Sequence, residues 1–204
     1  MKTVFVNVEK CVGCRHCEIA CAVEHSHTRS LFSALGEDMQ PRPRISVGLG
    51  VDFLTFPNRC RHCNPAPCMQ ICPTNAISMD QETGSVLINA DRCISCGMCA
   101  MVCPFSVIGF HKMPDADGVA AGKCDNCIDR QREGKVPACV DACKTGALLF
   151  GEINEIAAVS RQDVVMKVTR DFKGGEVSEI PPNIVLFQGI REKIARIGPL
   201  PSSD

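Results

Sequence analysis

Apolar and polar residues alternate at the start of the chain, in Met-Lys-Thr-Val-Phe-Val-Asn-Val, which predicts a β-strand. Two apolar runs flank the polar stretch at residues 81–85, which predicts a β-hairpin over residues 76–89. Residues 22–59 begin polar and become apolar toward their end, which predicts a loop followed by a β-ribbon. Residues 109–123 carry Asp-Ala-Asp-Gly, which predicts a surface loop.

The C-terminal part, residues 151–204, contains no cysteine and reads as an extension. Helical spacing of its first apolar residues predicts an amphipathic helix over residues 152–168, carried by Ile153, Ile156, Ala157, Ser160 and Val164. A glycine pair follows Lys173, then a strand-like run at 183–187 and a short helical pattern at 190–197. Two roles are open for this extension: a cap that shields a cofactor, or a docking element for a partner protein.

Two features of the chain indicate the cellular compartment of the protein. No apolar stretch approaches the ~18 residues that a membrane span needs. The start of the chain shows neither an apolar signal segment nor a twin arginine. We therefore expect a cytoplasmic protein that meets a membrane only through a partner.

Sixteen cysteines fall into four groups of four, with none left over. Group one is Cys11, Cys14, Cys17 and Cys21; group two is Cys60, Cys63, Cys68 and Cys72; group three is Cys93, Cys96, Cys99 and Cys103; group four is Cys124, Cys127, Cys139 and Cys143. Groups one and three read C-x2-C-x2-C-x3-C, the bacterial spacing for iron–sulfur ligation, in which the fourth cysteine serves a neighbouring cluster. The sequence predicts four [4Fe–4S] clusters held by sixteen thiolates.

Similar fragments follow the last cysteine of groups two, three and four: Cys-Pro-Thr-Asn-Ala-Ile, Cys-Pro-Phe-Ser-Val-Ile and Cys-Lys-Thr-Gly-Ala-Leu. Each predicts a short turn or helix that leads into an apolar strand, and the prolines after Cys72 and Cys103 favour a helix that starts there. This is an internal repeat of a ferredoxin half-module. We expect an α+β fold in which four halves make two modules.

Three other uses of the cysteines compete with iron–sulfur ligation, and the first of them, a redox C-x-x-C of thioredoxin type, would not need four groups of four. Disulfides require an oxidising compartment and are typical of small secreted chains. Structural zinc prefers two C-x2-C pairs that close one tetrahedral site, as in a scaffolding protein, and tight triplets with a separate fourth cysteine suit it poorly. Iron–sulfur ligation explains the spacing best.

The formal net charge of −1 does not include the cofactors. Each oxidised cluster with its four thiolates contributes about −2, which brings the loaded protein to roughly −9. Cations stand beside the ligands at Lys10, Arg15, Arg61, Arg92, Lys123 and Lys144. They either stabilise the reduced clusters or balance surface charge. The absence of a basic excess argues against nucleic-acid binding.

The spacing alone allows sequential pairing of the groups (one with two, three with four) or nested pairing (one with four, two with three). A resemblance to a known family favours one of these two pairings. The span from Cys11 to Leu149 resembles the four-cluster iron–sulfur subunits of bacterial oxidoreductases, including those of dimethyl sulfoxide reductase, formate dehydrogenase and hydrogenase complexes. The motifs that carry it are Cys-Arg-His-Cys with Pro-Cys and Cys-Pro in group two, Cys-Ile-Ser-Cys-Gly-Met-Cys in group three, and Cys-Asp-Asn-Cys with Pro-Ala-Cys in group four.

The resemblance implies nested pairing, in which each triplet takes its fourth ligand from the partner group. The four implied ligand sets are site I (Cys11, Cys14, Cys17, Cys143), site II (Cys21, Cys124, Cys127, Cys139), site III (Cys60, Cys63, Cys68, Cys103) and site IV (Cys72, Cys93, Cys96, Cys99). The modules would then be an outer one, residues 1–40 with 120–150, and an inner one, residues 57–112, inside a four-cluster domain of residues 1–150.

Within that family, residues 14–26 and the ending Cys-Lys-Thr-Gly-Ala-Leu at 143–148 look most like the ferredoxin-like partner of nickel–iron carbon monoxide dehydrogenase. The resemblance implies a non-catalytic electron carrier between that enzyme and a hydrogenase or a flavin oxidoreductase. The alternative is the iron–sulfur component of a molybdopterin oxidoreductase. The chain shows no nucleotide-binding glycine loop, nickel constellation or acid–base pair that would indicate catalysis of its own.

The five histidines are not needed as ligands, because sixteen thiolates complete four clusters. His16 and His62 each precede a ligand cysteine, and we expect them to donate hydrogen bonds to cluster sulfur or to the backbone. We expect His25, His27 and His111 to be ordinary loop residues.

Overall fold

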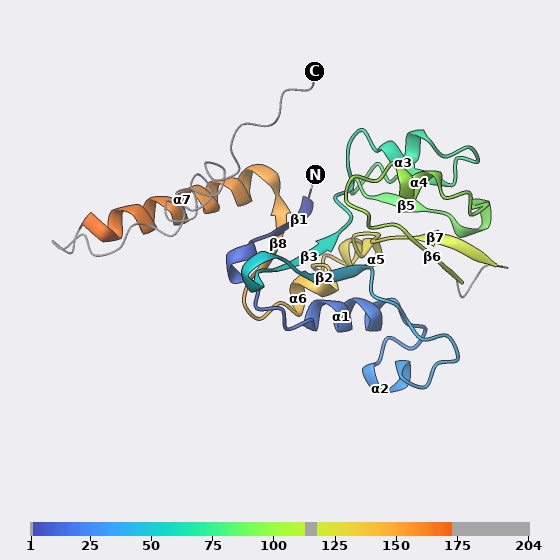
Figure 1. Cartoon of the computed structure of the whole chain (residues 1–204), viewed down its shortest axis with the longest axis horizontal. Coiled ribbons are helices and arrows are strands. Elements are labelled where there is room, and N and C mark those ends of the chain that lie inside the picture. Colours follow the sequence, from blue (N-terminus) through green and yellow to red (C-terminus); the bar gives the residue numbers. More distant parts are fainter. Residues whose placement is uncertain (1, 113–117, 173–204) are drawn as a thin grey trace, which may run out of the picture. The chain divides into compact units, whose positions relative to one another are not determined.

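The computed structural model describes residues 2–112 and 118–172. Contacts along the chain define two compact units, Met1–Ile153 and Asn154–Asp204. The described strands form two-stranded antiparallel sheets (Figure 1): β1 (Lys2–Val6) with β8 (Leu148–Glu152), β2 (Ile45–Leu49) with β3 (Thr55–Arg59), β4 (Ile77–Met79) with β5 (Val86–Ile88), and β6 (Gly109–Lys112) with β7 (Val119–Gly122).

Short helices and turns join the strands of the first unit. The 3₁₀ turns are η1 (Val8–Lys10), η2 (Val51–Phe53) and η3 (Ala90–Arg92). The α-helices of this unit are α1 (His16–Glu24), α2 (Leu31–Ala34), α3 (Pro67–Gln70), α4 (Met98–Met101), α5 (Ile128–Arg132) and α6 (Ala138–Asp141). The helix α7 (Ile153–Phe172) follows β8, and no described helix combines the length and apolar character that a membrane crossing requires.

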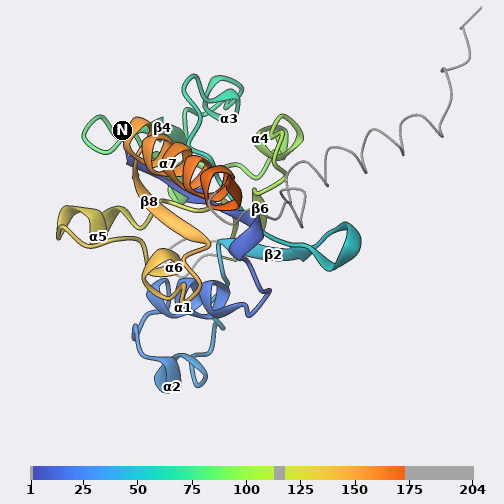
Figure 2. The same ribbon diagram turned by 90° about the vertical axis from the view of Figure 1, so that its left-hand side faces the viewer.

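The two ends of the cysteine-bearing region meet in one sheet. The predicted N-terminal strand forms as β1, and Val6 lies opposite Leu148 of β8. Helix α1 packs beside α6 below this sheet (Figure 2). The buried residues of this part combine aliphatic side chains with three cysteines: Val4, Ile45, Val47, Leu148, Cys17, Cys21 and Cys139. Groups one and four therefore share one core.

A second core lies where α3 packs beside α4. Its buried residues are Ala66, Ile77, Val86, Cys99, Ile108 and Ala121, and cysteines of groups two and three pack around them. The predicted hairpin is confirmed as β4 and β5. Its turn is held by Asp80, whose carboxylate accepts hydrogen bonds from the Thr83 N–H (2.8 Å) and the Thr83 hydroxyl (2.7 Å).

The prediction of a surface loop over residues 109–123 is wrong. The segment forms the hairpin β6–β7, in which Phe110 lies opposite Ala121. Ala120, Ala121 and Gly122 are buried, so this short strand packs inward. The acidic Asp-Ala-Asp-Gly stretch obscured the apolar strand beside it, and its residues 115–117 lie outside the described part of the chain.

Of the short turn or helix predicted after the fourth cysteine, the turn and the strand that follows it are confirmed, and the helix favoured by the prolines is wrong. In group two the helix α3 lies before Cys72, and the residues after Cys72 form a turn. Asn75 and Ser106 have left-handed φ angles of 51° and 50°, and each stands three residues after the last cysteine of its group. An isolated left-handed residue ends helical geometry, so the strand follows directly.

The segment between groups one and two is more helical than expected. Helix α1 extends to Glu24 and α2 lies within the expected loop, whereas the β-ribbon is confirmed as β2–β3. The helix expected after residue 151 is confirmed as α7. The break at Lys173, the strand at 183–187 and the helix at 190–197 lie outside the described residues.

Candidate iron–sulfur sites

All four cysteine groups begin with a loop of the same backbone shape. In each C-x-x-C the residue before the second cysteine has a positive φ: Gly13 (67°), His62 (50°), Ser95 (55°) and Asn126 (63°). Residues other than glycine adopt this conformation only uncommonly, so its recurrence at His62, Ser95 and Asn126 marks a required turn. At Gly13 a β-carbon would also come within 2.8 Å of Thr55 Cγ2. The loops are structural repeats of one another.

Two of the implied ligand sets line cavities. One cavity is bordered by all four cysteines of site IV together with apolar residues such as Ile77, Ile88 and Phe110. The other is bordered by all four cysteines of site III together with Val86, Ile108 and Lys123. In each cavity a triplet from one group meets the last cysteine of another group, and neither lining contains a carboxylate or an imidazole.

The cysteines of the outer groups also come together across the sequence. Burial raises the pKa of Cys17 to about 11, and negative charge at Glu18, Cys14 and Cys143 adds to the rise. Burial raises the pKa of Cys21 as well, and its charged neighbours are the first three cysteines of group four. The last cysteine of group one therefore lies near the first three cysteines of group four, while Cys143 lies near Cys17 of group one.

Backbone N–H groups point at the cysteine sulfurs. Donor–sulfur distances are 3.2 Å from Arg44 to Cys21, 3.3 Å from Ala76 to Cys72, 3.4 Å from His62 to Cys60, 3.4 Å from Ala121 to Cys93 and 3.4 Å from Asn126 to Cys124. Hydrogen bonds to charged acceptors favour the thiolate form, and hydrogen bonds to sulfur adjust the potentials of iron–sulfur clusters.

Burial differs between the sites. All four cysteines of site II are buried, and site III has one buried cysteine and three intermediate ones. The two exposed cysteines are Cys14 of site I and Cys96 of site IV. Of the four implied ligand sets, those of sites I and IV each include an exposed cysteine, whereas those of sites II and III include none.

The donor atoms fit iron–sulfur clusters. All sixteen thiols are free of disulfides, and apolar walls surround them in the two cavities. Two buried side-chain nitrogens, Arg59 Nε and His62 Nε2, have no hydrogen-bond partner among the described residues. An anionic cluster with sulfide acceptors suits such donors, since orphaned buried donors are rare in folded proteins. When bound, such clusters supply one-electron redox chemistry.

The His62 ring is held to the backbone through Nδ1, and its Nε2 has no partner among the described residues, so the expected hydrogen bond to cluster sulfur stays a prediction. The backbone N–H of His62 donates to Cys60 Sγ, but its ring Nδ1 accepts a hydrogen bond from the Val86 N–H at 2.9 Å. Burial, with the positive charges of Lys123 and Arg59, lowers the pKa of His62 to about 2, so the ring is neutral and its proton sits on Nε2. His16 is exposed at the start of α1.

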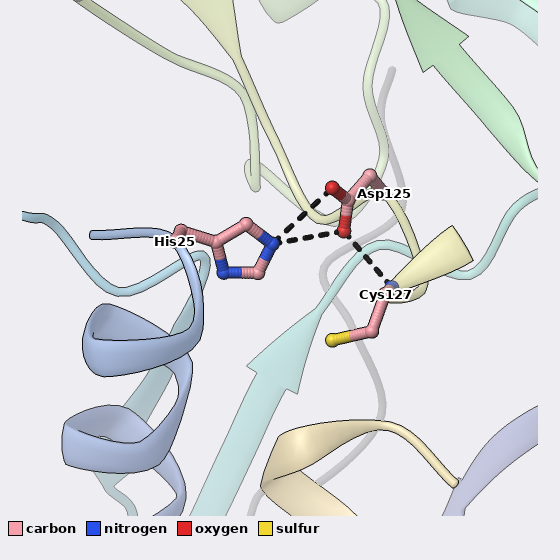
Figure 3. A group of neighbouring side chains, drawn as sticks. All are labelled: His25, Asp125 and Cys127. Atoms are coloured by element: carbon pink, nitrogen blue, oxygen red, sulfur yellow. Dashed lines mark hydrogen bonds and ion pairs between the residues drawn. The ribbon is translucent and has the colours of Figure 1, made fainter. Parts of the chain in front are cut away.

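His25 is not an ordinary loop residue (Figure 3). It follows α1, and its Nδ1 lies 2.7 Å from the Cys21 carbonyl oxygen while its Nε2 lies 3.1 Å from Asp125 Oδ1. Asp125 also accepts from Arg44 Nη1 at 2.6 Å and from the Cys127 N–H at 2.9 Å. This network joins α1 to the group-four loop. No sequence pattern indicates it, because His25 and Asp125 are 100 positions apart.

Asp125 is held ionised by these contacts. Burial alone would raise the pKa of Asp125, but the hydrogen bond from His25 and the charge of Arg44 lower it below its usual range. A carboxylate whose pKa is lower in the folded state stabilises that state above the unfolded pKa, and this stabilisation is lost as the pH falls through the folded pKa.

Replacement of Asp125 by Asn should therefore destabilise the loaded protein by about 2 kcal/mol, because Arg44 then keeps a charge without a charged acceptor. Anaerobic denaturant unfolding at pH 7 measures the change. Asp129→Asn is the matched control, because Asp129 is exposed and its nearest cations lie 3.8 Å and 3.9 Å away. Equal losses in the two variants would contradict this account.

The cations that flank the ligands are not equivalent. Lys10, Arg15, Arg92 and Lys144 are exposed. Arg61 stacks between Phe56 and Phe105, with ring-centroid distances of 5.4 Å and 5.3 Å, and covers the rim of site III. Lys123 is buried, and so is Arg59, a further cation that directly precedes Cys60 and that the sequence pattern alone does not single out.

The repeated loops, the paired cores and the converging cysteines define a ferredoxin-like α+β protein built to hold iron–sulfur clusters. Comparison with known families agrees: residues 51–153 match the 4Fe-4S dicluster domain. The chain belongs to this family of iron–sulfur electron-transfer proteins, and its role is electron transport without catalysis of its own.

Three relatives illustrate the similarity. "Electron transport protein HydN" of Escherichia coli K12 is 34% identical over 170 residues, which cover 78% of this chain and 93% of HydN. An "Iron-sulfur protein" of Rhodospirillum rubrum is 34% identical over 178 residues, covering 83% and 92%. A tetrathionate reductase component of Salmonella typhimurium is 28% identical over 152 residues, covering 74% and 58%.

Proposed function

We propose that this protein conducts electrons through four [4Fe–4S] clusters held in sites I to IV with nested ligation. Two cavities lined by four cysteines each support sites III and IV, and the charged neighbours of Cys17 and Cys21 support sites I and II. On this proposal residues 1–40 with 120–150 form the outer module and residues 57–112 the inner one.

The observation that carries the proposal is the exposure of one cysteine in each of sites I and IV, Cys14 and Cys96, and of none in sites II and III. Burial raises the pKa of Cys139 of site II, and negative charge at Cys17 of site I adds to the rise. Burial likewise raises the pKa of Cys60 of site III, and negative charge at Cys124 of site II adds to it. These couplings support the order I, II, III. Sites III and IV share the second core. Because only sites I and IV contain an exposed cysteine, a redox partner can approach the clusters there, and electrons enter at one of these two sites and leave at the other.

For the partners, we propose carbon monoxide dehydrogenase as electron donor and a hydrogenase or flavin oxidoreductase as acceptor, in the cytoplasm. The support is the likeness of residues 14–26 and 143–148 to the ferredoxin-like partner of that enzyme. A second candidate is the iron–sulfur component of a molybdopterin reductase. The relative named for tetrathionate reductase favours a reductase complex of some kind.

Anaerobic affinity purification from native cells tests the partners. We expect a nickel-containing carbon monoxide dehydrogenase to copurify, and purified dehydrogenase with carbon monoxide to bleach the iron–sulfur absorbance of the isolated chain. Recovery of a molybdopterin enzyme without a nickel enzyme would overturn the partner assignment. Metal analysis separately tests the cofactors: about sixteen iron atoms per chain support four clusters, whereas about four zinc atoms would refute them.

A further inference from the structure

Buried polar side chains gather in one place in the first unit. The buried polar or charged residues among those described are Ser26, Arg59, His62, Ser85, Lys123 and Asn126. All but Ser26 lie where the group-two loop and the group-four loop meet the start of β5. We call these five residues the polar junction. Its members contact the first cysteine of site III, Cys60, and Cys124 of site II.

The polar junction has an internal symmetry. His62 and Asn126 occupy the same position in their C-x-x-C loops, and the N–H of each donates to the first cysteine sulfur at 3.4 Å. Both side chains contact the start of β5: Val86 donates to His62 Nδ1, and Asn126 Nδ2 donates to Ser85 Oγ at 3.3 Å. Two copies of one loop therefore contact neighbouring residues at the start of β5.

Arg59 crosses this symmetric junction. It directly precedes the first cysteine of group two, but its guanidinium reaches the group-four loop. Nη2 lies 3.4 Å from Cys124 Sγ and 2.8 Å from Asn126 Oδ1, while Nη1 donates to the Val4 carbonyl oxygen at 3.3 Å. The residue is fully buried. Its charge is therefore placed at site II, although its sequence motif belongs to site III.

Lys123 has the converse arrangement: its motif belongs to site II, and its side chain lies at site III. It directly precedes the first cysteine of group four, but it lines the cavity of site III. Its Nζ donates to the carbonyl oxygens of Val86 and Cys124, and the side chain is 6% exposed. The positive charge of Lys123 opposes the rise in pKa that burial imposes on Cys60 and Cys68 of site III.

Arg59 and Lys123 donate to uncharged oxygens and, in the case of Arg59, to the sulfur of Cys124. Burial of a charge without a partner is costly, and an arginine does not lose its proton in proteins. Burial acts to lower the pKa of Arg59, yet negative charge at Cys124, Cys139 and Cys60 raises it. The compensating charge for both cations therefore has to come from the occupants of sites II and III.

The other two groups provide a contrast within the same chain. Lys10 and Arg92 directly precede the first cysteines of groups one and three, so they hold the position that Arg59 and Lys123 hold in groups two and four. Both are exposed, and water screens their charges. The same motif position therefore carries screened cations at the terminal sites and buried cations at the middle sites.

We propose that Arg59 and Lys123 form a crossed pair of buried cations that stabilises the reduced clusters in the two middle sites, each from the sequence motif of the neighbouring site. The inference rests on the proposed four-cluster function and deepens it. Reduction adds one electron, and thus one negative charge, to a cluster without making or breaking a bond, and a nearby unscreened cation favours that state. The electron comes from the redox protein that reduces a terminal site.

Arg59→Gln and Lys123→Gln test this proposal, with Arg92→Gln as matched control at the equivalent exposed position. Anaerobic redox titration followed by electron paramagnetic resonance measures each cluster's midpoint potential. We expect Arg59→Gln and Lys123→Gln each to lower the midpoint of one cluster, a different one in each variant. The expected fall in the reduced-to-oxidised ratio is at least tenfold, about 59 mV for a one-electron couple. Arg92→Gln should change no ratio more than about twofold.

Unchanged potentials in both junction variants, or an equal shift in Arg92→Gln, would overturn the crossed-cation proposal while leaving the iron content, and thus the four-cluster function, intact. Where a Gln variant loses iron, the charge-preserving variants Arg59→Lys and Lys123→Arg distinguish an electrostatic role of the side chain from a steric one. Full iron and near-normal potentials in these charge-preserving variants support an electrostatic role. Loss of iron in them as well would overturn it in favour of a purely steric one. Wild-type protein without about sixteen iron atoms would instead refute the proposed function.

Discussion

Replacement of Cys143 by Ser should remove the cluster of site I and leave the clusters of sites II, III and IV. The reason is that Cys143 closes the triplet of group one in the nested arrangement, not a triplet near it in sequence. Iron should fall from about sixteen to about twelve atoms per chain, since each cluster holds four. Iron analysis of anaerobically purified protein measures the loss.

Double variants identify which cluster is lost, because two substitutions in the same cluster remove no more iron than one of them does. Cys14→Ser combined with Cys143→Ser should retain about twelve iron atoms, since both ligands belong to site I. Cys96→Ser combined with Cys143→Ser should retain about eight, since they belong to different sites. Sequential pairing of the groups requires the opposite result, because Cys143 would then complete the cluster of Cys96.

Removal of iron should unfold the first unit. Three of the seven buried residues in the first core are cysteines, and further cysteines pack against the second core. Without metal these regions lose part of their packing, and binding free energy of this kind is folding free energy. We expect a chelator under reducing conditions to abolish amide-exchange protection across β1–β8 and β4–β5, and zinc not to restore the wild-type protection.

Helix α7 is the internal control for this experiment, because Ile153–Phe172 contains no cysteine. Its amide exchange should change by less than about threefold when iron is removed, because local opening governs its exchange. Protection that persists throughout β1, β4, β5 and β8 in iron-free protein would show that the first unit folds on its own side chains. It would contradict the role assigned here to the clusters.

Local features of the fold could be predicted because they depend on neighbouring residues. The hairpin around residues 81–85 and the strand at residues 2–6 follow from alternation and turn residues. The misread segments had competing signals. Prolines after Cys72 and Cys103 favoured helices, but the left-handed residues Asn75 and Ser106 impose turns. Acidic residues at 115–117 masked the short strands β6 and β7.

The chemistry can be assigned from the order of residues alone: sixteen cysteines stand at iron–sulfur spacing in four similar groups, because a cluster needs thiolates at short fixed intervals. Which cysteines come together and which cations are buried follows only from the folded arrangement of the chain. Arg59, Arg92, Lys10 and Lys123 are indistinguishable by position in the motif, yet only Arg59 and Lys123 are buried. Burial depends on the packing of the group-two and group-four loops around β5, and contacts between residues more than sixty positions apart produce that packing.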